Sequence, residues 1–250
     1  MNTFKSSNPA LSQRVFDRSR QYASSEVMTY KGTMNKTMLL LALVFLGAAY
    51  TWRVYFESLT PQSVYTWMLV GGIGGFITSL VVIFAPKTSP YTAPIYSALE
   101  GIFLGGLSAF FAASYGAGIV IQAVGLTFAT FFLMLLAFRT GVIKVTNRFR
   151  RVVLAATGAI ALTYLVSLIL SFFNINIGFI YSGGTFGIVF SLIVIAVAAL
   201  NILMDLDFIE RSTAMGAPKF MEWYGAFGLM VTLVWLYIEF LRLLARVSRK

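Results

Sequence analysis

The fold is decided by the longest uncharged stretch of the chain, which runs from Val152 to Met204 and reads VVLAATGAIALTYLVSLILSFFNINIGFIYSGGTFGIVFSLIVIAVAALNILM. A transmembrane helix needs about 20 mostly apolar residues to cross the hydrocarbon core. This stretch is too long for one span, and Asn174, Gly178 and the run Ser182 to Gly184 interrupt it near its middle. It lacks the alternation of polar and apolar residues that marks a membrane β-strand. It therefore predicts two membrane-spanning helices joined by a turn.

The rest of the chain has the same character. Hydrophobic residues make up 58% and charged residues 11%, against roughly 45–50% and 25% in soluble domains. Tyr115 to Gly118 supplies a turn in a second long uncharged run. The sequence predicts an all-α polytopic membrane protein, a seven-helix transmembrane bundle over residues 38–250 that follows a polar cytoplasmic tail over residues 1–37. Besides the two spans above, we expect spans near residues 38–56, 58–86, 93–114, 119–138 and 224–244.

Basic residues indicate how the chain is oriented. Lysine and arginine gather in the tail and in the connections after the second, fourth and sixth spans, whereas the opposite connections hold only Arg53. By the positive-inside rule this places the N-terminus in the cytoplasm. A net charge of +10 is explained by the same bias, so it does not favour nucleic-acid binding. The basic C-terminal end, Arg242 to Lys250, falls on the wrong side after seven spans. Either it lies at the far interface, which we favour, or the last segment is re-entrant.

The composition also limits the chemistry. The chain has no Cys and no His, which removes disulfides, thiolate metal sites, the commonest general base and the commonest transition-metal ligand. No His-Glu-x-x-His motif or phosphate-binding loop is present, so we predict neither an enzyme nor a cofactor. Arg14, Arg18 and Arg20 lie among serines, as in an organellar transit peptide, but acidic residues lie among them. We therefore expect a bacterial inner-membrane protein with no cleaved signal.

Small residues recur at helical spacing in two of the predicted spans. Gly71 and Gly75 are one turn apart, and Ser97, Gly101 and Gly105 form a ridge along one helix face. Such ridges allow helix backbones to approach closely in lipid. We interpret them as packing surfaces.

Four acidic residues lie within or at the ends of the spans: Glu100, Asp205, Asp207 and Glu239. An ionisable group at the centre of a span costs about 2.5–3.5 kcal/mol, so such groups usually face the bundle interior and have a function. Asp205 and Asp207 point about 200° apart on a helix and cannot both face one neighbour. Both could also mark a wet end of the sixth span, and Glu239 could pair with Arg242 at i+3.

Three segments around these acids resemble one family. Ala93-Pro94-Ile95-Tyr96-Ser97-Ala98-Leu99-Glu100-Gly101, Met204-Asp205-Leu206-Asp207-Phe208-Ile209 and Leu236-Tyr237-Ile238-Glu239-Phe240-Leu241-Arg242-Leu243-Leu244 are similar to the Bax inhibitor-1/YccA-like family, in its bacterial branch with a long N-terminal tail. The resemblance implies a bundle with the last helix central and a pH-sensitive calcium leak. It also implies a proton-sharing acid pair on the sixth and seventh helices, which matches Asp205 and Glu239. The second acid is Glu here where the family pattern has Asp.

Carboxylate chemistry supplies a mechanism for such a pair. Two carboxylates in a low dielectric share a proton, because both cannot ionise cheaply. At higher pH the dianion would repel itself and favour separation or a cation. We therefore predict a cation (calcium) leak channel or transporter gated by Asp205 and Glu239, which would bind calcium weakly and transiently, with Asp207 and Glu100 along the ion path. The alternative is a non-conducting regulator that binds another membrane protein, such as a quality-control protease, through its tail and helix faces.

Overall fold

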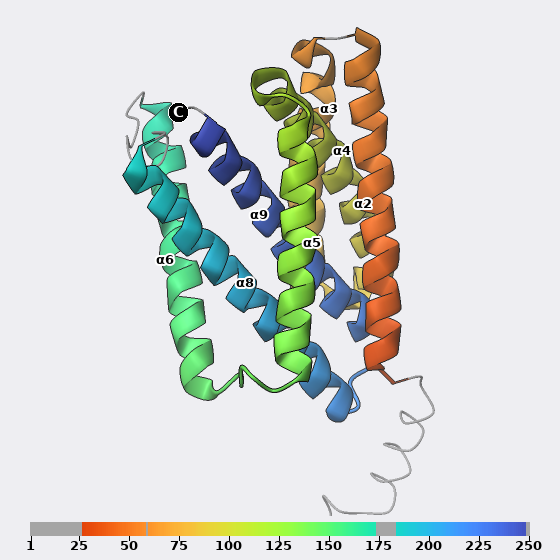
Figure 1. The fold of residues 1–250 in the computed structure, drawn as a ribbon. Helices are drawn as coiled ribbons and strands as arrows, with labels where there is room; N and C mark the ends of the chain where they lie inside the picture. The colour runs from red at the N-terminus through yellow and green to blue at the C-terminus, as the bar shows by residue number, and fades with distance from the viewer. Residues whose placement is uncertain (1–26, 59, 174–183, 249–250) are drawn as a thin grey trace, which may run out of the picture.

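The computed structural model describes residues 27–58, 60–173 and 184–248. Within these residues the chain is helical, and seven helices are long and apolar enough to cross a membrane. The predicted all-α, seven-helix architecture is therefore confirmed, and the chain is a multi-pass membrane protein (Figure 1). Its helices are α2 (Tyr30–Ser58), α3 (Tyr65–Phe84), α4 (Ser89–Tyr115), α5 (Gly118–Arg139), α6 (Asn147–Phe172), α8 (Thr185–Ala214) and α9 (Met221–Ser248), with short 3-10 turns η2 (Pro61–Val64) and η3 (Pro86–Thr88) before α3 and α4.

The turns lie where the sequence breaks its apolar runs. α4 ends at Tyr115, and the φ of 86° at Gly116, the next residue, lies in the left-handed region that glycine adopts readily. This confirms the predicted turn between the third and fourth spans. α6 ends at Phe172 and α8 begins at Thr185, so the predicted interruption falls between these helices. Most of its residues lie outside the part of the chain that the structure describes.

The first helix begins earlier than predicted, at Tyr30 instead of near Met38. Its polar first turns are stabilised by contacts with the start of α9. The buried carboxylate of Glu222 accepts hydrogen bonds from the amide and the hydroxyl of Thr29, both at 2.8 Å, and pairs with Lys36. Just before the helix, Val27 forms an isolated antiparallel bridge with Pro218. The segment from Val27 is thus fastened to the α8–α9 connection by contacts distant in sequence, which hydropathy could not reveal.

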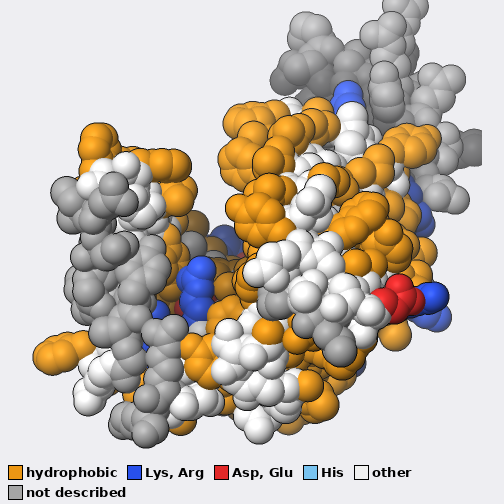
Figure 2. Space-filling view, turned by 90° about the horizontal axis from the view of Figure 1, so that it is seen from above, with side chains coloured by type: hydrophobic (Ala, Val, Ile, Leu, Met, Phe, Trp, Pro, Cys, Tyr) orange, Lys and Arg blue, Asp and Glu red, His pale blue; other side chains and the backbone are white. Residues whose placement is uncertain are grey.

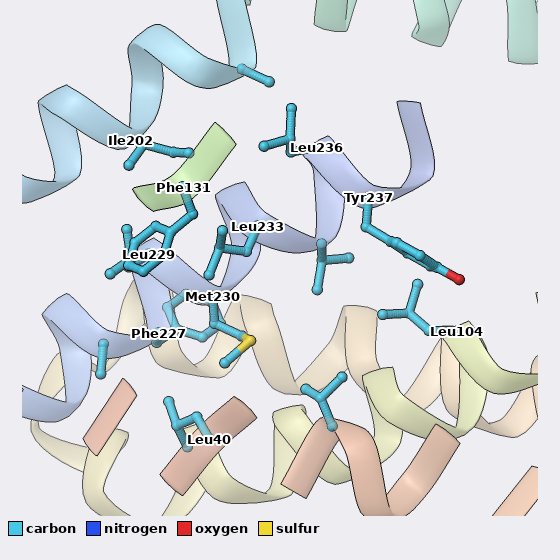
Figure 3. Close-up of a cluster of buried hydrophobic side chains, with 14 of the residues drawn as sticks. Leu40, Leu104, Phe131, Ile202, Phe227, Leu229, Met230, Leu233, Leu236 and Tyr237 are labelled. Atoms are coloured by element: carbon cyan, nitrogen blue, oxygen red, sulfur yellow. The ribbon is translucent and has the colours of Figure 1, made fainter. Parts of the chain in front are cut away.

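The last helix is the core of the bundle. α9 packs against α8, α2, α5 and α4, and it has the largest buried share of the seven spans. Figure 3 shows side chains of α9 pointing to different sides, where they meet residues of its neighbours. These contacts form one continuous apolar cluster, which includes Leu40, Leu104, Phe131, Ile202, Leu229, Met230, Leu233 and Leu236. The predicted central position of the last helix is confirmed.

α9 is a single unbroken helix that ends at the opposite end of the bundle from the start of α2 (Figure 1). This is the full-span alternative, and the helix shows no re-entrant turn. Two of its basic residues have partners within the protein. Arg242 pairs with Glu239 at 2.9 Å, and buried Arg246 donates to the carbonyl of Gly187 at 2.8 Å and to the hydroxyl of Ser191. These contacts show how two of the basic residues near the end of the seventh span, which the positive-inside rule did not explain, are accommodated.

The predicted glycine ridges lie at helix crossings. A Cβ added to Gly71 of α3 would lie 2.6 Å from the carbonyl oxygen of Leu99, and one added to Gly47 of α2 would lie 2.6 Å from that of Ala98. Cβ atoms on Gly101 and Gly105 would overlap the α2 backbone. α2, α3 and α4 therefore pack at backbone distance, as the small-residue pattern indicates.

Replacing Gly101 with valine is expected to destabilise the bundle by about 1–3 kcal/mol or more, because the new methyl groups must displace the backbone of α2. A Cβ added to Gly158 of α6 would meet no atom within 4 Å, so Gly158→Val is the matched control and should have little effect. Thermal unfolding of purified protein in detergent checks both. Equal melting temperatures for the two variants would contradict the close packing of α2 on α4.

Candidate ion path

Asp205 lies on α8 and faces α9. Its Oδ2 accepts a hydrogen bond of 2.6 Å from the hydroxyl of Thr232. A Cβ on Gly228, one turn before Thr232, would lie 4.0 Å from Oδ1 of the same carboxyl group. The small residue and the hydroxyl together provide a polar recess for Asp205 on the central helix.

Glu239 also lies on α9 but is directed toward α6. It is fully buried, and its Oε1 accepts hydrogen bonds from the hydroxyl of Tyr164 at 2.8 Å and from Arg242 at 2.9 Å. The guanidinium of Arg242 lies 5.0 Å from the centre of the Tyr164 ring, within cation–π range. Oε2 of Glu239 is buried and has no hydrogen-bond partner among the described residues. The i+3 pairing with Arg242, one of the two interpretations of the sequence, is present.

The structure does not bring Asp205 and Glu239 into contact. Asp205 meets α9 at Thr232, and Glu239 follows Thr232 by about two helical turns, or roughly 10 Å along the axis. Each carboxyl group has its own partners, a hydroxyl for Asp205 and a phenol and a guanidinium for Glu239. A shared proton requires the two groups to touch, so the predicted direct pair is not formed in this conformation. Thr232 takes the place on α9 that the prediction gave to Glu239.

Asp207 faces away from α9, as the angle of about 200° between alternate helix positions requires. Its carboxylate pairs with Arg150 at the start of α6 and accepts a 2.9 Å hydrogen bond from Arg211, one turn further along α8. Arg211 also reaches the carbonyl of Val145, before α6 begins. The end of α8 is thereby joined to the beginning of α6 by charge-assisted hydrogen bonds, which are among the stronger polar contacts in proteins.

Further polar side chains lie between the ionic contact of Asp207 and that of Glu239. The amide of Asn201 on α8 donates to the hydroxyl of Thr157 on α6 at 2.8 Å. Asn201, Asp205 and Asp207 follow one another toward the C-terminal end of α8, which lies at the same end of the bundle as the start of α2. Glu239 and Arg246 lie toward the C-terminal end of α9, at the opposite end of the bundle. Viewed from that opposite end, the surface is hollowed, and basic side chains lie in the hollow (Figure 2). A series of polar groups therefore extends along α6, α8 and α9 through most of the bundle.

Glu100 does not belong to this series. It lies on α4 and is directed at α3, where a Cβ on Gly75 would lie 3.0 Å from its Oε2. Gly75 thus leaves room for the carboxyl group. The prediction that Glu100 and Asp207 lie along the same path is not supported by this arrangement, because one faces α3 and the other faces α6.

Metal binding has little basis in the static arrangement. No group of three or more Asp and Glu side chains that could hold a metal ion occurs within residues 27–58, 60–173 and 184–248. Calcium takes six to eight oxygen ligands, and Asp205 and Glu239 are too far apart to supply two of them to one ion. The predicted calcium site on this pair is therefore not formed here.

Sequence reasoning missed the neutral members of the polar series. Asn201 carries a signal that could have been used, since an amide inside an apolar span is rare. Thr157, Tyr164, Ser191 and Thr232 carry none, because hydroxyl residues occur throughout membrane helices. Only the packing of α6 and α9 against α8 shows which of them face acids.

Comparison with known protein families agrees with this architecture. The family described as Bax inhibitor 1 like matches residues 8–249, nearly the whole chain. The chain belongs to this family. No match was found among curated proteins. The family resemblance noted in the sequence is thus confirmed, and the arrangement of acids above describes how this Bax inhibitor 1 like protein differs from the expected acid pair.

Replacing Arg150 with glutamine is expected to lower stability by about 1–3 kcal/mol, because Asp207 would lose a charged hydrogen-bond partner at a largely buried position. Arg211→Gln should cost less, since the side chain of Arg211 is 51% exposed and water can replace it. Thermal unfolding in detergent measures both variants. A larger loss for Arg211→Gln than for Arg150→Gln would contradict the assigned roles.

Proposed function

We propose that this protein is a pH-sensitive cation leak of a bacterial inner membrane that passes calcium along the polar series between α6, α8 and α9, with its N-terminus in the cytoplasm. The observation that supports it most is the placement of acidic groups at several depths among these three helices: Asp207 of α8 faces α6, Asp205 of α8 faces α9, and Glu239 of α9 faces α6. Buried ionisable groups in membrane helices are costly and usually serve transport.

The contacts correspond to a closed conformation of such a path. Asp207 is occupied by two arginines and Glu239 by Arg242 and Tyr164. Tyr164 and Arg150 belong to α6, so the same contacts hold α6 against α8 and α9. A cation could use these carboxylates only after the arginines move away. Weak, sequential binding to one carboxylate at a time suits a leak, because each ion must also leave.

The contacts also change the expected sign of the pH dependence. The acid pair predicted from the sequence would open at higher pH, when it becomes a dianion. Glu239 instead faces Arg242 on its own helix and Tyr164 on α6, and a neutral side chain at this position would hold both partners less strongly. We therefore propose that acidification weakens the clamp between α6 and α9 and opens the path.

In liposomes loaded with a calcium indicator, wild-type protein should show a calcium influx that rises as the outer and inner pH fall. Glu239→Gln should leak more at neutral pH and respond less to pH, because its side chain is neutral at every pH. Asp205→Asn should also alter the flux, since it changes the polar recess at Thr232.

Glu210→Gln is the matched control, because Glu210 is an exposed acid on α8, and it should behave as wild type. Absence of calcium flux at every pH would overturn the proposal. An unchanged pH profile in Glu239→Gln would remove Glu239 from the mechanism while leaving the leak itself in place.

The alternative of a non-conducting regulator is tested by removing the tail. The deletion should stop at residue 26, because Val27 is bound to the α8–α9 connection and Thr29 to the start of α9. For a leak, proteoliposomes containing the shortened protein should retain wild-type flux. Loss of binding to another membrane protein, measured by co-purification from native membranes, together with no flux in either form, would favour the regulator.

A further inference from the structure

A second internal feature lies on the opposite side of α9 from the polar series. It is a cavity of about 260 Å³ between α2, α4, α5 and α9. α9 borders it with Met230, Leu233, Val234 and Tyr237, none of which takes part in the contacts of Asp205 or Glu239. The proposed ion path therefore does not explain this cavity.

We infer that the cavity opens between α2 and α5, because both helices line it but pack little against each other. α2 packs mainly on α4 and α9, and α5 packs mainly on α9, so the rings of Phe45 and Phe128, with centres 6.0 Å apart, bridge the gap between them. Phe45 is 48% exposed. Both helices are membrane spans, so the medium outside this mouth is the hydrocarbon of the bilayer.

The chemistry of the lining favours an apolar occupant. The hydroxyls of Ser108 and Tyr237 are hydrogen-bonded to each other at 2.7 Å, and Ser108 is also within 2.6 Å of the carbonyl of Leu104. Thr127 donates to the carbonyl of Ala123 at 2.7 Å. The other lining side chains are apolar except for the indole N–H of Trp52. A buried water needs two to four polar partners, and a lipid headgroup needs more. The hydroxyls of Ser108, Thr127 and Tyr237 already form hydrogen bonds within the protein, so they offer few such partners.

The shape favours a chain. Along α2 the lining extends from Leu41 to Trp52, about 16 Å at the helical rise of 1.5 Å per residue. A cavity of this volume over such a length is narrow. Trp52 lies near the end of α2, and tryptophan is enriched where membrane helices meet the headgroup region.

We propose that the cavity binds one acyl chain of a membrane phospholipid, which enters between α2 and α5 with its headgroup at the Trp52 end. The chain contacts the face of α9 formed by Met230, Leu233 and Val234. This proposal does not rest on the proposed calcium leak and can be tested without measuring transport.

The test is native mass spectrometry of protein exchanged into a mild detergent containing a mixture of dioleoyl phosphatidylethanolamine and dioleoyl phosphatidylglycerol. Wild-type protein should retain one phospholipid. Ala48→Phe and Val124→Phe fill the cavity from the α2 and α5 walls and should lower its affinity for the phospholipid about tenfold, the effect of excluding two methylene groups from an apolar site. Ala42→Phe and Ala129→Phe add the same ring to exposed faces of the same helices and should retain the lipid. A wild-type protein without bound phospholipid, or equal retention in filled and control variants, would overturn the site.

A second measurement applies if the filled variants fail to fold. Two proteins with a single tryptophan, Trp52 or Trp67, are prepared by changing the other tryptophans to phenylalanine. Titration with 9,10-dibromostearic acid should quench Trp52 with saturation near one equivalent, whereas Trp67, on α3 and outside the cavity, should be quenched only in proportion to bulk probe. Identical quenching curves for the two proteins would contradict the proposal.

Discussion

The carboxylate of Glu239 is fully buried on the central helix, and the contacts that neutralise it determine how the bundle is assembled on that side. An ionised group in an apolar interior is tolerated only when charged and hydrogen-bonding partners surround it. Arg242 comes from the same helix, but the phenol of Tyr164 must come from α6. Asp207 makes the same demand at the other end of the interface and obtains Arg150 from α6. Apolar contacts of α6 add to these polar ones, in a small cluster around Ile160 and Val194 and at buried Val153, so both kinds of contact attach this helix to the bundle.

The positions of the helices could be predicted from the sequence because hydrocarbon thickness sets the length of each apolar run. The turn at Gly116, the opposite directions of Asp205 and Asp207, and the i+3 pair of Glu239 and Arg242 followed from local geometry in the same way. The start of α2 did not, because its polar residues are stabilised by Glu222, far along the chain.

The candidate site was predicted less well, for a physical reason. Whether Asp205 and Glu239 form a pair depends on the axial register between α8 and α9. An offset of two helical turns is enough to turn one proton-sharing pair into two independent carboxyl groups. The resemblance to the family identified an acid on each helix, but it could not show that Thr232 lies opposite Asp205. Glu100 illustrates the same limit. Its position in a span was evident from the sequence, whereas the neighbour that it faces, Gly75 of α3, depends on how α3 packs against α4.

The central helix thus has two faces with different chemistry. Thr232 and Glu239 meet polar partners on α8 and α6, whereas Met230, Leu233 and Tyr237 border the apolar cavity beside α2, α4 and α5. Any rotation or sliding of α9 that separates Glu239 from Tyr164 must also reshape that cavity, since both faces belong to one rigid helix. A ligand shifts a conformational equilibrium only by its difference in affinity for the two states. An acyl chain that fits the cavity as it stands would therefore favour the conformation in which the ionic contacts are closed, and the composition of the bilayer would influence the polar interface without touching it.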